Sequence, residues 1–197
     1  TGANNTAIGH VALGDNTTAS NNTAVGYFAL NANTTGYDNV AVGRNSLDAN
    51  IGGHSNTALG ESSLTSNTEG DRNVAVGQNA LAINSTGGSN VAVGRGALDA
   101  NTTASNNTAV GDLAATALTT GAANVAIGTN ALAAATTGAR NTIVGVDSSN
   151  QITSGADNTA MGYDSLTRCT TGGSNVAIGK DAGDNITSGS ANTCVGL

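Results

Sequence analysis

A five-residue motif that returns every 17 residues constrains this chain more than any other feature. The motif reads Asn, Thr or Val, then Ala in ten of twelve copies, an apolar residue and Gly, and its copies run from Asn5 to Asn192. Eleven equal steps without insertion or deletion are typical of stacked identical units, as in solenoids. We therefore expect residues 1–197 to form a single repeat domain of twelve motif copies, the last belonging to a partial repeat.

The repeat unit is expected to consist of short strands. Seventeen residues are too few for two helices and their turns, and the apolar residues show no helical period. With the motif Asn as position 1, positions 2 and 4 of an extended segment point to one side and position 3 to the other. Val40 and Val42 should face together, with Ala41 facing away. The sequence predicts an all-β fold, a parallel β-roll or β-solenoid of stacked 17-residue coils.

The alanine at position 3 suggests a face that meets another surface closely. The chain has one Phe, three Tyr, one Met and no Trp, so the large side chains of an ordinary core are nearly absent. The free energy gained by burying side chains inside each coil is then smaller than the cost of the conformational entropy lost when the coil becomes ordered. A second interface must therefore contribute to stability. We expect chains to associate through this alanine face, whose members are Ala24, Ala41, Ala58, Ala75, Ala92, Ala109 and Ala126.

Other positions predict the inside and outside of the coil. Gly occupies position 5 in all twelve copies, which fits a positive φ or a close backbone approach. Position 1 Asn suits turns and could form an amide ladder. Position 6 accepts almost any residue and should face solvent. Position 9 is Leu in eight of eleven repeats, and each exception coincides with an aliphatic residue at position 12, as in Ala115 with Leu118, Ser149 with Ile152, and Gly183 with Ile186. This exchange predicts that position 9 faces a fixed interior volume.

Composition argues against several classes of partner. The net charge is −7 and the six basic residues are scattered, so no basic stripe exists to bind nucleic acid. No apolar run approaches the roughly 20 residues that span a bilayer, which predicts no membrane insertion by this segment. The chain lacks an initiator Met and starts within a repeat, so we expect a processed product or a segment of something longer.

The residues that carry chemistry are few and dispersed. His10 and His54 occupy positions 6 and 16, about three coils apart, and are interpreted as exposed loop histidines. The acidic residues fall largely at variable positions, and no calcium-binding nonapeptide repeat occurs. Cys169 and Cys194 match no metal-ligand spacing and are expected to be small buried or semi-buried thiols. The sequence predicts no enzyme, no cofactor and no metal.

Three aromatic residues lie in one repeat. Tyr27, Phe28 and Tyr37 could together form a surface-contact patch that stacks on a sugar or a protein partner. The competing interpretation is packing near one end of a fibre.

The repeats also resemble known fibre proteins. "NVAVG", "NTAVG" and "NVAIG" are similar to the Asn-Ser-Val-Ala-Ile-Gly repeat of trimeric autotransporter adhesin heads. The longer phrase "NNTAVGYFALNANTTGYDN" resembles repeat regions of phage and bacterial tail-fibre proteins, which often end in a self-cleaving chaperone domain. The adhesin resemblance covers the whole chain and implies a left-handed parallel β-roll, three chains around an axis and two short strands per coil. Positions 2 and 4 would then fill the roll. The 17-residue unit is longer than the usual adhesin-head unit.

Together these features lead us to expect a non-enzymatic structural or adhesive fibre segment, extracellular, in a phage tail or head fibre. The alternative is the head of a bacterial trimeric autotransporter adhesin at the cell surface. Partners would be copies of the chain, in a homotrimer or stacked end to end as a filament, and a cell-surface receptor or glycan. An ice-binding solenoid is a further alternative. We disfavour it because Thr at position 2 alternates irregularly with Val, which indicates an interior position.

Overall fold

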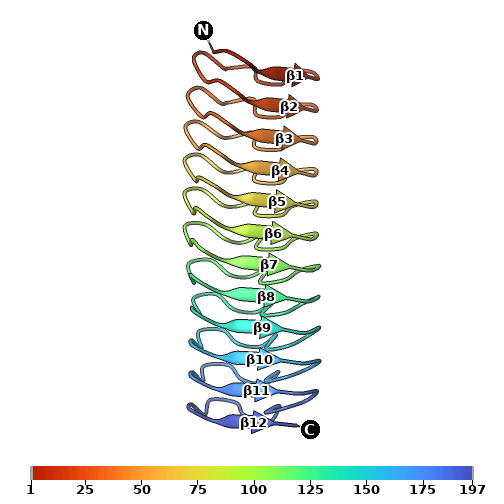
Figure 1. The fold of residues 1–197 in the computed structure, drawn as a ribbon, viewed down its shortest axis with the longest axis vertical. Helices are drawn as coiled ribbons and strands as arrows, with labels where there is room; N and C mark the ends of the chain where they lie inside the picture. Colours follow the sequence, from red (N-terminus) through yellow and green to blue (C-terminus); the bar gives the residue numbers. More distant parts are fainter. Residues whose placement is uncertain (1, 197) are drawn as a thin grey trace.

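The computed structural model describes residues 2–196 as a straight β-solenoid, in which each repeat contributes one three-residue strand (Figure 1). None of these residues is helical, and the strands form one parallel sheet in chain order. The strands are β1 (Thr6–Ile8), β2 (Thr23–Val25), β3 (Val40–Val42), β4 (Thr57–Leu59), β5 (Val74–Val76), β6 (Val91–Val93), β7 (Thr108–Val110), β8 (Val125–Ile127), β9 (Thr142–Val144), β10 (Thr159–Met161), β11 (Val176–Ile178) and β12 (Thr193–Val195). The predicted all-β fold and the 17-residue coil are confirmed.

The strand register explains why the period never slips. Each residue pairs with the residue at the same position one coil later, so Val40 lies beside Thr57 and Ala41 beside Ala58. Hydrogen bonds of the same kind continue past the strand, as from the Gly60 amide to the Val42 carbonyl at 2.8 Å. A one-residue insertion would turn every following side chain to the wrong side of the sheet.

The glycine at position 5 is required by backbone approach and by conformation. Gly111 has a φ of 139°, in a region that side chains disfavour. A Cβ atom there would lie 2.5 Å from the Gly128 carbonyl oxygen in the next coil. Both reasons inferred from the sequence therefore apply at this position.

The side of the coil opposite the strand differs from the two-strand unit that the resemblance implies. Positions 7 and 9 have left-handed backbone conformations, with φ of 56° at Asn45 and 51° at Leu47. These two kinks keep the segment from extending, and no second strand forms. The segment still bonds from coil to coil, since the Leu47 amide donates to the Ser63 carbonyl at 3.0 Å.

Large aliphatic side chains at positions 9 and 12 fill the interior, as expected. Leucines at position 9, such as Leu47 and Leu98, are completely buried. Leu118 and Ile152, the replacements at position 12, are buried as well, and Ile186 packs against the same core. Each coil thus supplies its aliphatic group from one of two neighbouring places.

Buried asparagines form two columns of amides along the rod. At position 1, the Asn39 amide N–H donates to Asn22 Oδ1 at 2.9 Å, and Asn39 Nδ2 donates to the Gly53 carbonyl. This column continues to Asn192. The predicted position 1 ladder therefore exists, with the backbone amide as its regular donor.

A second column, at position 12, stops partway along the rod. Asn50 Nδ2 donates to Asn33 Oδ1 at 2.8 Å, and equivalent bonds lead to Asn101. Position 12 of the following coil is Leu118, which offers no donor. The Oδ1 atom of Asn101 is therefore buried without a hydrogen-bond partner.

The expected orientation of the strand residues was wrong. The alanine face, predicted as the contact between chains, lies inside the single chain and is fully buried there, at Ala24, Ala41, Ala58, Ala75, Ala92, Ala109 and Ala126. The physical reason is the thinness of the coil, in which position 3 faces position 9 directly. A Cβ added to Gly183 at position 9 would lie 3.5 Å from the Cβ of Ala177 at position 3. Only a small side chain fits opposite a leucine, and positions 2 and 4 point outward.

Candidate functional site

The outward side of the sheet, formed by positions 2 and 4 of β1–β12 and called here the strand face, is a regular surface that follows the rod from β1 to β12. Position 2 carries Thr or Val, and position 4 carries an aliphatic residue or Met. Many of these side chains are exposed, including Leu59 at 48% and Met161 at 44%. Exposed apolar residues that recur in register along a whole molecule are typical of an interaction surface.

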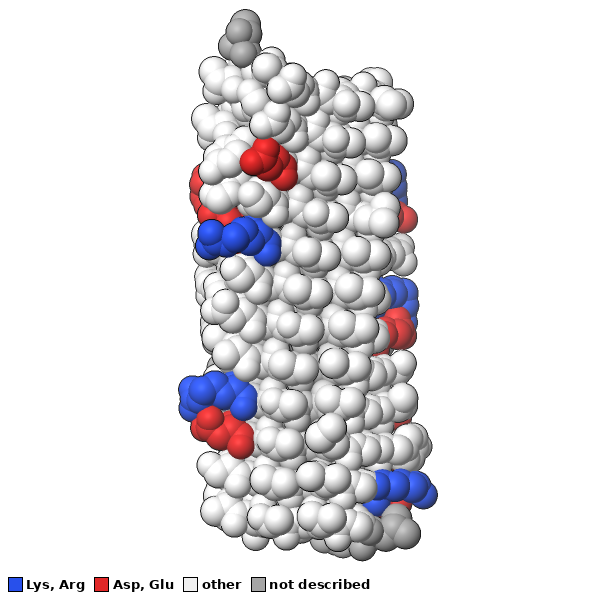
Figure 2. Space-filling view, in the orientation of Figure 1, with Lys and Arg blue, Asp and Glu red and all other residues white. Residues whose placement is uncertain are grey.

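On the face shown in Figure 2, charged side chains lie along the two edges of the rod and leave the surface between them uncharged. We call positions 16 and 17, before each strand, the leading edge, and positions 6 and 7, after it, the trailing edge. On the trailing edge Arg95 Nη2 lies 2.9 Å from Asp112 Oδ2. On the leading edge Arg140 Nε lies 2.6 Å from Asp157 Oδ1, and this bond lowers the pKa of Asp157. The strand face is thus an uncharged band between two charged margins.

The predicted aromatic patch is divided between the two edges. Tyr27 and Phe28 lie on the trailing edge, where their ring centroids are 4.5 Å apart. His10, at the same position one coil earlier, stacks on Tyr27 with centroids 5.3 Å apart and an interplanar angle of 12°. Tyr37 is absent from this group, since it lies on the leading edge.

Tyr37 belongs to a second cluster on the leading edge. Its ring stacks on His54 with centroids 4.6 Å apart, and His54 Nε2 lies 3.2 Å from Asp71 Oδ2. Tyr37, His54 and Asp71 all occupy position 16 of successive repeats. From the sequence, both histidines were interpreted as exposed loop residues. Each histidine, however, shares its repeat position with a tyrosine one period away, His10 with Tyr27 and His54 with Tyr37. This pattern could have predicted both stacks.

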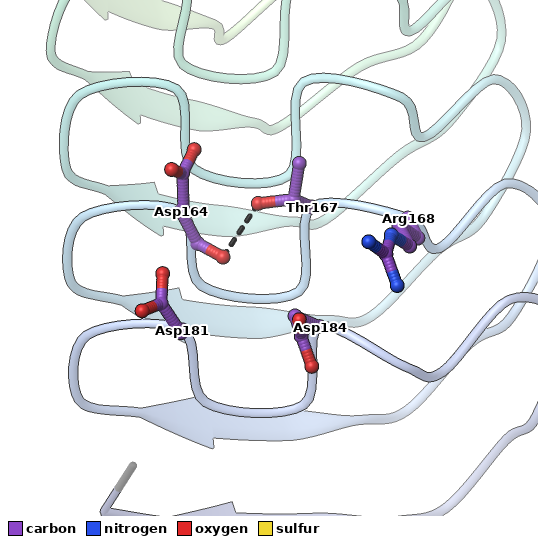
Figure 3. A pocket seen from close by; sticks show the side chains of 5 residues that line it. All are labelled: Asp164, Thr167, Arg168, Asp181 and Asp184. Carbon is purple, nitrogen blue, oxygen red and sulfur yellow. Dashed lines mark hydrogen bonds between the residues drawn. The ribbon is translucent and has the colours of Figure 1, made fainter.

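A surface hollow of about 150 Å³ lies near the C-terminal end, between the turns of two successive coils (Figure 3). Its lining residues are Asp164, Thr167, Arg168, Asp181 and Asp184. The Thr167 hydroxyl donates to the Asp164 carbonyl at 2.5 Å. Among residues 2–196, no group of histidine, cysteine and acidic side chains is arranged to hold a metal ion. This hollow was not predicted from the sequence, although two of its aspartates share position 7 of successive repeats.

The two cysteines are placed as expected. Cys169 is buried at position 12, and Cys194 is half-buried in the last coil. Burial raises the pKa of the Cys169 thiol, whose Sγ lies 3.6 Å from the Gly172 carbonyl oxygen. A thiol of raised pKa is a poor nucleophile at neutral pH.

Comparison of the chain with protein-family models, curated proteins and solved structures finds no match. Within the described part of the chain, no helix has the length and apolar character needed to cross a membrane.

Proposed function

We propose that this chain is a non-enzymatic structural segment of an extracellular fibre, foremost a phage tail or head fibre, in which copies associate side by side through the strand face. The observation that carries the proposal is the uncharged, partly apolar strand face, which extends along all twelve strands between two charged edges. The interface originally expected on the alanine side is replaced by this outward face.

A second copy is the occupant that best fits the strand face. The face repeats once per coil, with neighbouring strands about 4.8 Å apart. Only a partner with the same axial period matches such a surface over its whole length, and another copy of the chain has that period. Burial of Leu59, Ile127 and Met161 between copies would remove exposed apolar area from water. Three copies around an axis is the arrangement that the resemblance to adhesin heads implies.

The head of a bacterial trimeric autotransporter adhesin is the closest alternative, because it would use the same rod and the same assembly. The two fibres differ in what lies beside the repeats. A membrane anchor encoded downstream in the full gene product would favour the adhesin, whereas a chaperone domain or neighbouring virion genes would favour the phage.

The assembly is tested by native mass spectrometry together with solution scattering. We expect an elongated particle of three times 18.9 kDa. Val76→Asp places a charge on the strand face and should reduce the assembly to single chains that keep their β circular dichroism. Ile83→Asp, at an exposed position outside the strand face and both charged edges, is the matched control and should remain assembled. A parent protein that stays monomeric at high concentration would refute the proposal.

Ice binding is a second candidate, and one observation favours it. From the sequence, position 2 was expected to face the interior, and this expectation was wrong. Position 2 faces outward, with Thr in seven of twelve strands. Valine in the other five strands, and side chains as large as Leu59 and Met161 at position 4, interrupt a regular hydroxyl array. Absence of thermal hysteresis at high protein concentration would remove this candidate.

A further inference from the structure

We propose that the two aromatic clusters are halves of one site, which is completed when the trailing edge of one copy meets the leading edge of the next at the same axial level. One copy supplies Tyr27 and Phe28, and its neighbour supplies Tyr37 and His54. The inference rests on the proposed side-by-side assembly and adds its direction and register: parallel copies with no axial offset.

Within a single chain the two clusters are too far apart to meet. Tyr27 lies two residues after the end of β2, whereas Tyr37 lies three residues before the start of β3. The strand face separates the two edges along every coil. Seven residue steps lead from position 16 across a strand to position 6, or about 20 Å of nearly extended chain. Tyrosine side chains cannot bridge that width.

Parallel association brings opposite edges together. When copies surround an axis with their strand faces inward, the trailing edge of each copy lies against the leading edge of its neighbour. Tyr27 comes just after β2 and Tyr37 just before β3, so both lie at the level between these two strands. Copies without axial offset would therefore place the two rings within about one coil spacing of each other along the axis.

Charges beside the clusters favour the same register. Asp38 is adjacent to Tyr37 on the leading edge of β3, and Arg44 lies on the trailing edge of that strand. In unshifted parallel copies Tyr37 and Asp38 lie, in axial level, between Tyr27 and Arg44 of the neighbouring trailing edge, so that the aspartate is within reach of the arginine. A shift of one coil in one direction would bring Asp38 closer to Glu61, and a shift in the other direction would take it away from Arg44. Among the described residues Asp38 forms no ion pair within its own chain, so its charge is available to a neighbour.

The aromatic content of the chain agrees with a local role in assembly. The chain contains three tyrosines and one phenylalanine, and only Tyr163 lies outside the two clusters. Tyr27 and Tyr37 are 52% and 45% exposed in the single chain. Large half-exposed aromatic rings contribute strongly to protein interfaces. At the proposed junction both tyrosines become covered, so that one end of the rod fixes the register for the remaining coils.

Cysteine cross-linking tests the inference directly. In a background that carries Cys169→Ala and Cys194→Ala, a chain with both Tyr27→Cys and Tyr37→Cys is oxidised with diamide. Covalent oligomers up to the trimer are expected on a non-reducing gel, because each junction contributes one thiol from each edge. Chains with only one of the two tyrosine substitutions should stay monomeric on the gel. A mixture of the two singly substituted chains, assembled together, should yield covalent dimers.

The matched control moves one thiol along the same edge. Gln78→Cys combined with Tyr37→Cys keeps one thiol on each edge but places them about two coils apart in axial level, and it should not cross-link. Native mass spectrometry of each variant distinguishes an incorrect register from a failure to assemble. Trimers without cross-links between the two tyrosine positions would overturn the register and leave the strand-face assembly standing. Single chains in every variant and in the parent protein would overturn the assembly itself.

Discussion

Ile143 and Ser149 are both completely buried within one coil, at the facing positions 3 and 9, and the serine stands where most coils have a leucine. Ile143 is the only isoleucine at position 3, and its side chain is completely buried. A large residue on the strand side is thus accommodated by a small residue on the facing side. The interior of each coil holds a limited volume that the chain distributes among positions 3, 9 and 12.

This relationship predicts that the same substitution has different costs in neighbouring coils. Ala92→Ile faces Leu98 and should lower the free energy of unfolding by about 1–3 kcal/mol through overpacking. Ala109→Ile faces Ala115, as Ile143 faces Ser149, and should cost less than about 1 kcal/mol. Denaturant unfolding of the two variants measures the difference. Equal losses would show that the facing residue does not set the available space.

The interrupted amide column predicts a second difference. Asn84→Ala removes three hydrogen bonds, two donated by Nδ2 to Asn67 Oδ1 and the Gly87 carbonyl and one accepted from Asn101. Asn101→Ala removes two and also removes an acceptor that already lacks a partner. We expect Asn84→Ala to be the more destabilising by about 1–3 kcal/mol, since it leaves more buried polar atoms unpaired. Thermal unfolding of both variants at one protein concentration tests this order, which the reverse ranking would contradict.

Two carboxylates predict a pH dependence. Burial raises the pKa of Asp48 and of Asp99 above 3.8. The folded chain therefore holds these protons more tightly than the unfolded chain, and their stabilising contribution is lost as pH rises through the raised pKa values. Asp48→Asn with Asp99→Asn should remove this loss. The melting temperature of the variant relative to the parent should rise between acidic and neutral pH, whereas a constant difference would contradict the prediction.

The two thiols should react at different rates. Cys169 is buried and its pKa is raised, whereas Cys194 is half-buried in the last coil. Iodoacetamide at neutral pH is expected to modify Cys194 well before Cys169, because alkylation needs an accessible thiolate. Peptide mass spectrometry over a time course follows both sites. Equal rates would indicate that the coils around Cys169 open as readily as the end of the rod.

The period and the position 9 leucines were predictable because both leave a regular pattern in the sequence. The direction of position 3 was not, since an alternating strand has the same pattern whichever side faces inward. Ala41 could pack against its own chain or another one, and only the left-handed turns at Asn45 and Leu47 decide which side of the coil closes. Left-handed conformations are uncommon for leucine, so the residue type gave no sign of them.

The aromatic site was predictable only in part. Tyr27, Phe28 and Tyr37 were recognised as unusual in a chain with so few rings, but their nearness in sequence suggested one patch. In a solenoid, spatial neighbours are 17 residues apart, as His10 is from Tyr27. Reading the sequence in columns of repeat position would have found both stacks.

The in-register pairing of identical positions also sets how the length of this rod can change. Removal of one complete 17-residue unit would join a coil to another coil whose strand, glycine and buried asparagine lie in the same places. Each unit shortens or extends the rod by about 4.8 Å without altering its cross-section. The length of the rod is therefore set by the number of coils. Recombination between repeats could change this length in equal increments while the architecture stays the same.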